Sequence, residues 1–207
     1  GGRGGVRGPR EGARCGAVRG GRAVPDGAGT GYIHDKLQLG DTLSMTGPYG
    51  QFFTRKSAPE DLIFIAGGSG LSSPQSMVLD LLEHGDTRNI TLLQGARNLA
   101  ELYNRALFEQ LDRDHENFTY VPALDNPLPE DNWTGFSGYV HEAAIDHFDG
   151  QFGGHKAYLC GPPPMIDAAI TALMLGRLFE RDIYMERFLT AADGADGGTR
   201  SALFKKI

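Results

Sequence analysis

The sequence predicts an α/β protein built on a doubly wound, parallel sheet of five strands. Three observations support this fold class. Short, nearly continuous apolar runs recur along the chain, as expected of strands that are buried on both faces of a parallel sheet. Segments of helical periodicity separate these runs, and a glycine-rich turn joins the first run to the first such segment. Alternating strands and helices are typical of βαβ units, in which the strands run parallel.

Each of the five expected strands is bounded by polar or turn-forming residues. They are residues 62–66, 90–95, 118–121, 157–160 and 183–188. The first, Leu62 to Ala66, contains only apolar side chains, which indicates a central position in the sheet.

The expected helices lie between these strands. They are residues 73–83, 99–113, 139–148 and 165–175. The second has Leu102, Leu107, Phe108 and Leu111 as its apolar face. A polar loop from Asp125 to Gly135 should connect the third strand to the third helix. Before the sheet, residues 32–37 are expected to form a helical turn and residues 42–45 a strand.

The N-terminal segment has a different composition from the rest of the chain. Residues 1–31 contain twelve glycines and six arginines, and none of Leu, Ile, Phe, Tyr, Trp or Lys. Such a segment buries too little apolar surface to offset the entropy lost on ordering glycine, so residues 1–25 are expected to be disordered.

Two interpretations of this segment remain open. Its Arg-Gly-Gly steps, beginning at Arg3 and Arg19, resemble RNA-binding tracts but lack interleaved aromatic residues for base stacking. The abundance of Gly, Ala and Arg without Lys is also what an out-of-frame reading of GC-rich coding sequence produces.

Composition and charge exclude several classes of function. The formal net charge of −6 argues against a general nucleic-acid binder. Two cysteines, Cys15 and Cys160, are too few for a disulfide scaffold, a four-cysteine zinc site or a plant-type iron–sulfur cluster. No metal site is expected from the spacing of the six histidines, and no Ser/His/Asp or paired-carboxylate motif indicates a hydrolase. The chain has no apolar run of transmembrane length and no signal-peptide pattern, which predicts a cytoplasmic protein that does not contact the membrane.

The first chemically informative motif is the turn from Gly67 to Pro74, directly after the first buried strand. Glycine lets the backbone approach a phosphate closely, Ser72 or Ser73 could cap the following helix, and Pro74 suits its first turn. Free N–H groups at such a helix start bind pyrophosphate well. The alternative is an ordinary tight strand-to-helix turn.

A second motif, Cys160-Gly-Pro-Pro-Pro-Met165, also follows a buried strand and opens a helix. Cys160 should lie at the carboxyl end of its strand, facing the crevice where open α/β sheets bind ligands. A lone cysteine on a strand is more often an inert core residue, but the pairing of the two motifs favours a site.

The two motifs together resemble the ferredoxin–NADP reductase superfamily, and in particular the reductase components of multicomponent phenol hydroxylases. Further segments carry the same resemblance over about residues 26–207. They are residues 47–53, 94–98, 184–188, 188–194 and 200–207. The resemblance implies that NADH passes a hydride to FAD, and that electrons then reach a di-iron oxygenase component through a [2Fe–2S] centre.

The resemblance also implies site residues for the nucleotide. The pyrophosphate turn would comprise Gly67, Gly68, Ser69, Gly70 and Pro74. The ribose of the adenosine would lie at the end of the second strand, which comprises Gly95, Ala96 and Arg97. Arg97 could favour the 2′-phosphate of NADPH or be an ordinary loop charge, and NADH is the expected cofactor.

The same resemblance assigns the residues at the reacting end. Cys160 and Glu186 are the catalytic candidates, and the nicotinamide would be bordered by Cys160, Gly161, Pro162 and Met165. Phe188 would cover the flavin, and Gly27 and Thr30 match a flavin phosphate turn. The alternatives to these roles are that Glu186 is a surface carboxylate at a strand end and that Phe188 is an ordinary core residue.

Parts of the full family pattern are missing from this sequence. The Arg-x-Tyr-Ser type flavin motif and the cysteine ligands of the iron–sulfur cluster are absent. The expected organisation is therefore a disordered segment (1–25), a remnant of an FAD-binding barrel (26–56), an NAD-binding domain (57–192) and a tail (193–207). The rival interpretations are a truncated NADH-binding fragment without catalysis, and a free-standing flavin reductase whose barrel comes from another chain.

Overall fold

The computed structural model describes residues 27–38, 40–42 and 49–187, in two units that divide between Thr42 and Leu43. The first unit contains α1 (Ala28–Gly31) and the π-helical turn η1 (Tyr32–Lys36), which confirms the expected helical turn. No strand occurs among its described residues, and the barrel remnant stays a prediction. Most of the strand expected at 42–45, the segment 1–25 and the tail 193–207 lie outside the described residues.

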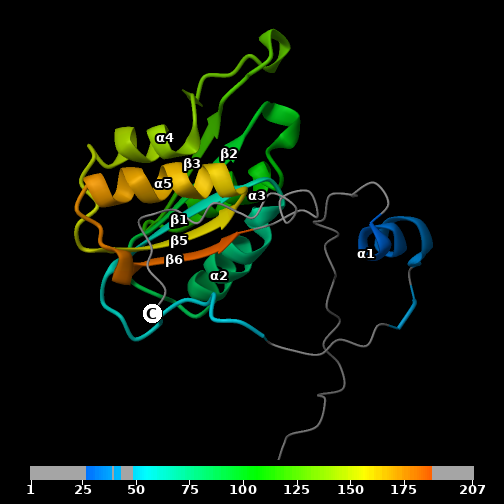
Figure 1. Ribbon diagram of the computed structural model, residues 1–207, viewed down its shortest axis with the longest axis horizontal. Coiled ribbons are helices and arrows are strands. Elements are labelled where there is room, and N and C mark those ends of the chain that lie inside the picture. Colours follow the sequence, from blue (N-terminus) through cyan, green and yellow to red (C-terminus); the bar gives the residue numbers. More distant parts are fainter. Residues whose placement is uncertain (1–26, 39, 43–48, 188–207) are drawn as a thin grey trace, which may run out of the picture. The chain divides into compact units, whose positions relative to one another are not determined.

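The second unit is built on a six-stranded sheet in the order β4-β3-β2-β1-β5-β6 (Figure 1). Its strands are β1 (Asp61–Gly67), β2 (Ile90–Ala96), β3 (Phe118–Leu124), β4 (Phe136–Ser137), β5 (His155–Gly161) and β6 (Ile183–Arg187). All neighbouring pairs are parallel, which confirms the predicted fold class. The sixth strand is β4, which lies between the loop expected up to Gly135 and the helix expected from Tyr139; it was not predicted because two residues are too short for a periodic pattern.

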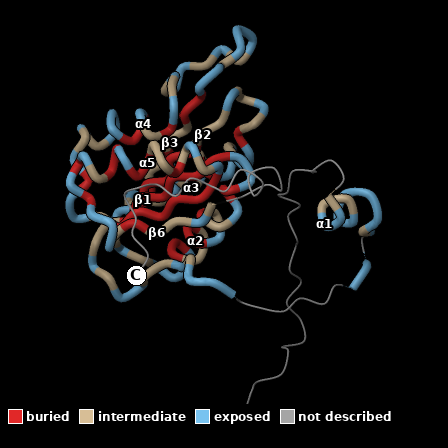
Figure 2. The backbone as a smooth tube through the Cα atoms, in the orientation of Figure 1, coloured by how far each residue is buried: buried red, intermediate tan, exposed pale blue. Residues whose placement is uncertain are grey.

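Helices cover both faces of this sheet. They are α2 (Ser72–Glu83), α3 (Arg105–Asp114), α4 (Val140–His147) and α5 (Pro163–Leu175). In Figure 1, α4 and α5 lie on one face and α2 lies on the other. Alternate residues of the central strands contribute to two cores, with Ile63 and Ile65 facing α4 and α5, and Leu62 and Phe64 facing α2. The strands are accordingly the most buried part of the unit (Figure 2).

The second expected helix starts later than the periodicity predicts. Residues 99–101 form a separate 3₁₀ turn, η3 (Leu99–Glu101), and α3 begins only at Arg105. Asn104 has a φ of 55°, a left-handed conformation that ends the regular backbone between the two. Leu107, expected on the apolar face, is 38% exposed, whereas Phe108 is fully buried.

The strand order places a topological switch point between β1 and β5. From β1 the chain adds β2, β3 and β4 on one side, and it then crosses to the other side of β1 to form β5. At such a point the connections leaving the two strands pass to opposite faces of the sheet, which leaves a crevice at the carboxyl ends of the strands. The ends of β1 and β5 are therefore where a ligand site is expected in this fold.

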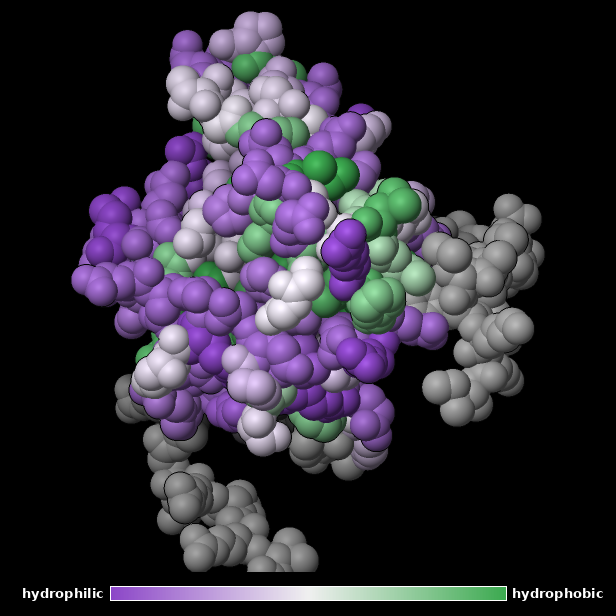
Figure 3. Space-filling model, turned by 90° about the vertical axis from the view of Figure 1, so that its left-hand side faces the viewer, coloured by the Kyte–Doolittle hydropathy of each residue, from purple (hydrophilic) through white to green (hydrophobic). Residues whose placement is uncertain are grey.

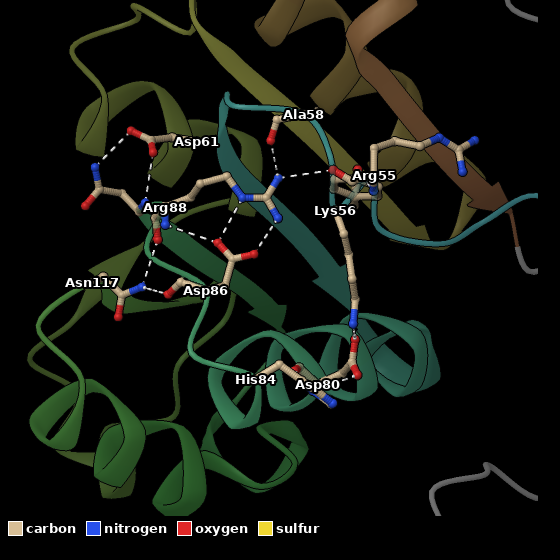
Figure 4. A network of polar contacts seen from close by, with 11 residues as sticks. Arg55, Lys56, Ala58, Asp61, Asp80, His84, Asp86, Arg88 and Asn117 are labelled. Atoms are coloured by element: carbon tan, nitrogen blue, oxygen red, sulfur yellow. Dashed lines mark hydrogen bonds and ion pairs between the residues drawn. The ribbon is translucent and has the colours of Figure 1, made fainter.

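The segment that enters β1 is fixed by a buried guanidinium group (Figure 4). Arg88 donates from Nη1 to the carbonyl oxygens of Arg55 and Ala58, at 3.1 and 2.8 Å. Its Nε and Nη2 donate to the Asp86 carboxylate at 2.9 and 2.7 Å, so four hydrogen bonds use this one side chain. Arg88 lies just before β2, so these hydrogen bonds connect the start of β2 to the segment that precedes β1.

The Asp86–Arg88 pair predicts a stability change at acid pH. The hydrogen bond from Arg88 is the largest influence on Asp86 and lowers the pKa of this carboxyl. Because the folded pKa lies below the unfolded value of about 3.9, the pair stabilises the fold above that pH, and the stabilisation is lost as the pH falls through the folded pKa.

We expect Asp86→Asn to lower the free energy of unfolding by about 2 kcal/mol at pH 7, with the difference from wild type shrinking below about pH 4. Urea unfolding at several pH values measures this difference, and Glu83→Gln, an exposed carboxylate on α2, is the control. A difference that does not change with pH would contradict the assignment.

The surface of the second unit is polar and acidic. Hydrophilic side chains dominate the face shown in Figure 3, and a group of hydrophobic side chains gathers toward one side of the view. Residues 61–187 contain eight Lys and Arg against nineteen Asp and Glu, a formal charge of −11. The net charge of this unit is therefore unfavourable for anions, and an anion would need oriented backbone N–H groups to bind here. Among the described residues, no helix combines the length and apolar character that a membrane crossing requires.

Candidate functional site

Two turns predicted from the sequence meet at the switch point. The 3₁₀ turn η2 (Gly68–Leu71) follows β1 and continues into α2, and the turn from Gly161 leads from β5 into α5. A Cβ on Gly70 would lie 2.3 Å from the carbonyl oxygen of Cys160 and 2.6 Å from the Cα of Gly161. The backbones of the two turns are thus in direct contact, which is possible only because residue 70 has no side chain.

Gly68 presents the open side of the first turn. It is exposed and has a φ of +55°, and a Cβ built on it would meet nothing within 4 Å. Ser69, beside it, is also exposed, whereas Gly67, Gly70 and Pro74 are buried. The start of η2 is therefore exposed, and the first N–H groups of a helical segment have no intrahelical acceptor, which makes this end suitable for a phosphate.

The predicted serine cap of α2 is wrong. Leu71 precedes the helix with helical backbone angles and no side-chain cap, because η2 runs directly into α2. The Ser73 hydroxyl instead donates to the Glu186 carboxylate at 3.4 Å. This contact joins α2 to β6 at the edge of the crevice.

The ends of β2 and β3 form a second rim. Gly95 pairs with Gly67 of β1, and a Cβ on Gly95 would lie 2.9 Å from Val140 at the start of α4. Beyond it, the carbonyl oxygens of Ala96 and Arg97 accept hydrogen bonds from the backbone N–H groups of Asp125 and Asn126, at 3.1 and 2.8 Å. The structure therefore brings the predicted ribose segment together with two exposed polar residues from the end of β3.

Three residues at this rim were missed by the sequence analysis. Asp125 and Asn126 were assigned to a polar loop, although they directly follow an expected strand, a signal that could have identified them. Tyr103 is 48% exposed, and its carbonyl oxygen accepts a hydrogen bond of 3.2 Å from the buried Gln94 of β2. An exposed aromatic ring held at a strand end is suited to stacking on a nucleotide base.

The two catalytic candidates lie side by side at the ends of β5 and β6. Cys160 and Glu186 are register partners in the parallel pair. Glu186 is exposed. Cys160 is completely buried, contrary to the prediction that it faces the crevice. Burial raises the pKa of the Cys160 thiol to about 12, Glu186 adds to this effect, and the nearby Ser73 hydroxyl opposes it. Cys160 is therefore a neutral thiol at pH 7 and not a nucleophile.

The other predicted site residues lie in the contact between the two turns, in the first unit, or outside the described residues. Pro162 is the N-cap residue of α5, and the Met165 sulfur would lie 2.6 Å from a Cβ on Gly67, so both belong to the contact between the turns. Gly27 and Thr30 lie in the first unit, where the Thr30 hydroxyl donates to the Gly27 carbonyl oxygen at 3.3 Å. Phe188 lies outside the described residues. In the part of the chain that the structure describes, no three His, Cys, Asp or Glu side chains gather as metal ligands would.

Comparisons with known proteins agree with this geometry. A family model described as the oxidoreductase NAD-binding domain matches residues 64–171, from β1 to α5. The chain is 69% identical to the reductase component of phenol 2-monooxygenase of Pseudomonas sp. (strain CF600), over 90% of this chain and 53% of that protein. It is 68% identical to the phenol hydroxylase P5 protein of Acinetobacter pittii (strain PHEA-2), again over 90% of this chain and 53% of the relative.

A solved structure shows the same fold. The cytochrome P450 reductase GcoB of Amycolatopsis superposes with a TM-score of 0.71 at 29% identity, over 81% of this chain and 50% of the other. The chain thus spans about half the length of the curated relatives that it matches.

Proposed function

The chain belongs to the oxidoreductase NAD-binding domain family, of the ferredoxin reductase type, and from this we propose that it binds NADH as the nucleotide half of a flavin-dependent reductase. The reductase would deliver electrons to the oxygenase component of a phenol hydroxylase, as the names of its relatives suggest. The observation that carries the proposal is the pair of turns at the switch point, with the N–H groups of η2 open to a pyrophosphate.

In this proposal, a dinucleotide would lie along the carboxyl edge of the sheet. The backbone at Gly68 and Ser69 would hold the pyrophosphate. Tyr103, Arg97 and Asp125 would hold the adenosine, and Cys160 and Glu186 would border the nicotinamide. Through these contacts the protein would fix the ring in one position and exclude water from its inner face.

The flavin is a separate question, because the chain lacks the Arg-x-Tyr-Ser type motif. FAD, when bound, would accept the hydride of NADH; Gly27, Thr30 and Phe188 stay candidates for holding it. The cysteine ligands of an iron–sulfur centre are absent from this sequence. A fragment that binds NADH without catalysis is therefore the second candidate function.

One experiment separates these candidates. The purified chain is titrated with NADH, with ADP-ribose as competitor, and its visible spectrum is then recorded after incubation with FAD, desalting and anaerobic addition of NADH. We expect saturable NADH binding in either case. A retained yellow flavin that bleaches with NADH supports the reductase, whereas a colourless protein that binds NADH supports the fragment. Absence of NADH binding would refute both.

We also expect Asp125 to set the preference for NADH over NADPH. Its carboxylate would accept hydrogen bonds from ribose hydroxyls but repel a 2′-phosphate, and its backbone N–H is hydrogen-bonded to the carbonyl oxygen of Ala96 at the end of β2. Asp125→Ser should raise the affinity for NADPH relative to NADH by about tenfold, or ~1.4 kcal/mol. Glu116→Ser is the control, because it removes the same charge near the amino end of β3, away from the site. An unchanged ratio of the two dissociation constants in Asp125→Ser would contradict this role.

A further inference from the structure

Three elements that are distant in the sequence meet beside the predicted nicotinamide position. Cys160 and Glu186 are the penultimate residues of β5 and β6, and Ser73 lies in the first turn of α2. Cys160 and Glu186 are register partners, and the Ser73 hydroxyl is 3.4 Å from Oε2 of Glu186. All three side chains lie on the face of the sheet that α2 covers, since Tyr158 and Tyr184, two residues earlier on each strand, stack in the core of that face.

Glu186 would bind a ligand in a defined geometry only if a neighbouring group restricts its side chain. It is an exposed residue at the end of an edge strand, where a free carboxylate side chain has several rotamers. The adjacent cation, Arg187, is directed to the opposite face, where its Nη2 donates to Asp167 of α5 at 2.6 Å. The contact from Ser73 therefore orients the carboxylate without neutralising its charge, and among the described residues no other group is hydrogen-bonded to the Glu186 side chain, so Oε1 is available to a ligand.

We propose that Ser73 is a positioning residue, whose hydroxyl holds the Glu186 carboxylate so that it accepts a hydrogen bond from the carboxamide N–H of the nicotinamide. This inference rests on the proposed NADH site and concerns its nicotinamide end only. A carboxylate is a strong acceptor for an amide donor, and fixing its rotamer in advance removes an entropy cost from binding. The hydroxyl of Ser73 is thus used for orientation and not as the helix cap that the sequence indicates.

The test compares two nucleotides that differ in the nicotinamide. Dissociation constants for NADH and for ADP-ribose, which lacks the nicotinamide ring, are measured by calorimetry for the full chain and its variants. We expect Ser73→Ala to weaken NADH binding about tenfold and to leave ADP-ribose binding within about twofold of wild type. Ser73→Thr, which keeps the hydroxyl, should restore NADH binding. Thr171→Ala removes a hydroxyl from the exposed side of α5, where it bonds to its own helix, and should change neither constant.

A double-mutant cycle tests whether Ser73 acts through Glu186. Glu186→Gln should selectively weaken NADH binding, and adding Ser73→Ala to it should cause little further loss. Additive effects, equal losses for both nucleotides, or unchanged NADH binding in Ser73→Ala would each overturn the proposal. If the wild-type chain binds neither nucleotide, the proposed function itself fails. If it binds ADP-ribose and NADH equally well, only the role of Ser73 and Glu186 fails.

Discussion

Gly68→Val is expected to reduce the affinity for NADH by at least about 100-fold, or ~2.7 kcal/mol. Gly68 is exposed at the start of η2, and a side chain there would occupy the space in front of the N–H groups that we assign to the pyrophosphate. Its φ of +55° adds a backbone strain of about 1–2 kcal/mol for valine. Calorimetric titration with NADH measures the affinity.

A control must separate this strain from the blocked site. Gly85, beyond the end of α2, has a φ of +68° and likewise has nothing within 4 Å of a built Cβ. Gly85→Val should therefore show a similar loss of thermal stability but normal NADH affinity. If both variants bind NADH as the wild type does, the pyrophosphate does not lie at Gly68.

Gly70→Ala is expected to have the largest effect on stability, a loss of about 3 kcal/mol or more in the free energy of unfolding. The new methyl group would lie 2.3 Å from the carbonyl oxygen of Cys160 and 2.5 Å from its carbonyl carbon. These atoms belong to the backbone of β5, which is buried between β1 and β6 and cannot move away cheaply. Urea unfolding measures the change, provided that the transition is two-state.

Two other glycines make this prediction specific. Gly67→Ala meets the sulfur of Met165 at 2.6 Å, but a flexible methionine side chain can shift, so the loss should be smaller. Gly153→Ala meets nothing within 4 Å and should leave stability unchanged. Equal stability of Gly70→Ala and Gly153→Ala would show that the two turns are not packed as described.

The fold and the positions of the two turns were largely predictable from the sequence. The run from Leu62 to Ala66 and the glycines after it are local patterns, and their burial and turn geometry depend mainly on neighbouring residues. The start of α3 was not predictable, because the left-handed backbone at Asn104 interrupts a regular apolar periodicity. The strand β4 was not predicted because two residues are too few to show the alternating pattern of a strand.

The sequence by itself determined the parallel α/β class, the two strand-to-helix turns after β1 and β5, and the family to which the chain belongs. The tertiary structure alone decided which residues meet: Ser73 with Glu186, Asp125 with Ala96, and Gly70 with the backbone of Cys160. It also decided that Gly68 is open while Gly70, two residues away, is tightly packed. The physical reason is that local patterns depend on short-range backbone and burial preferences, whereas these contacts depend on the order in which strands join the sheet, and that order brings together residues separated by more than 25 positions.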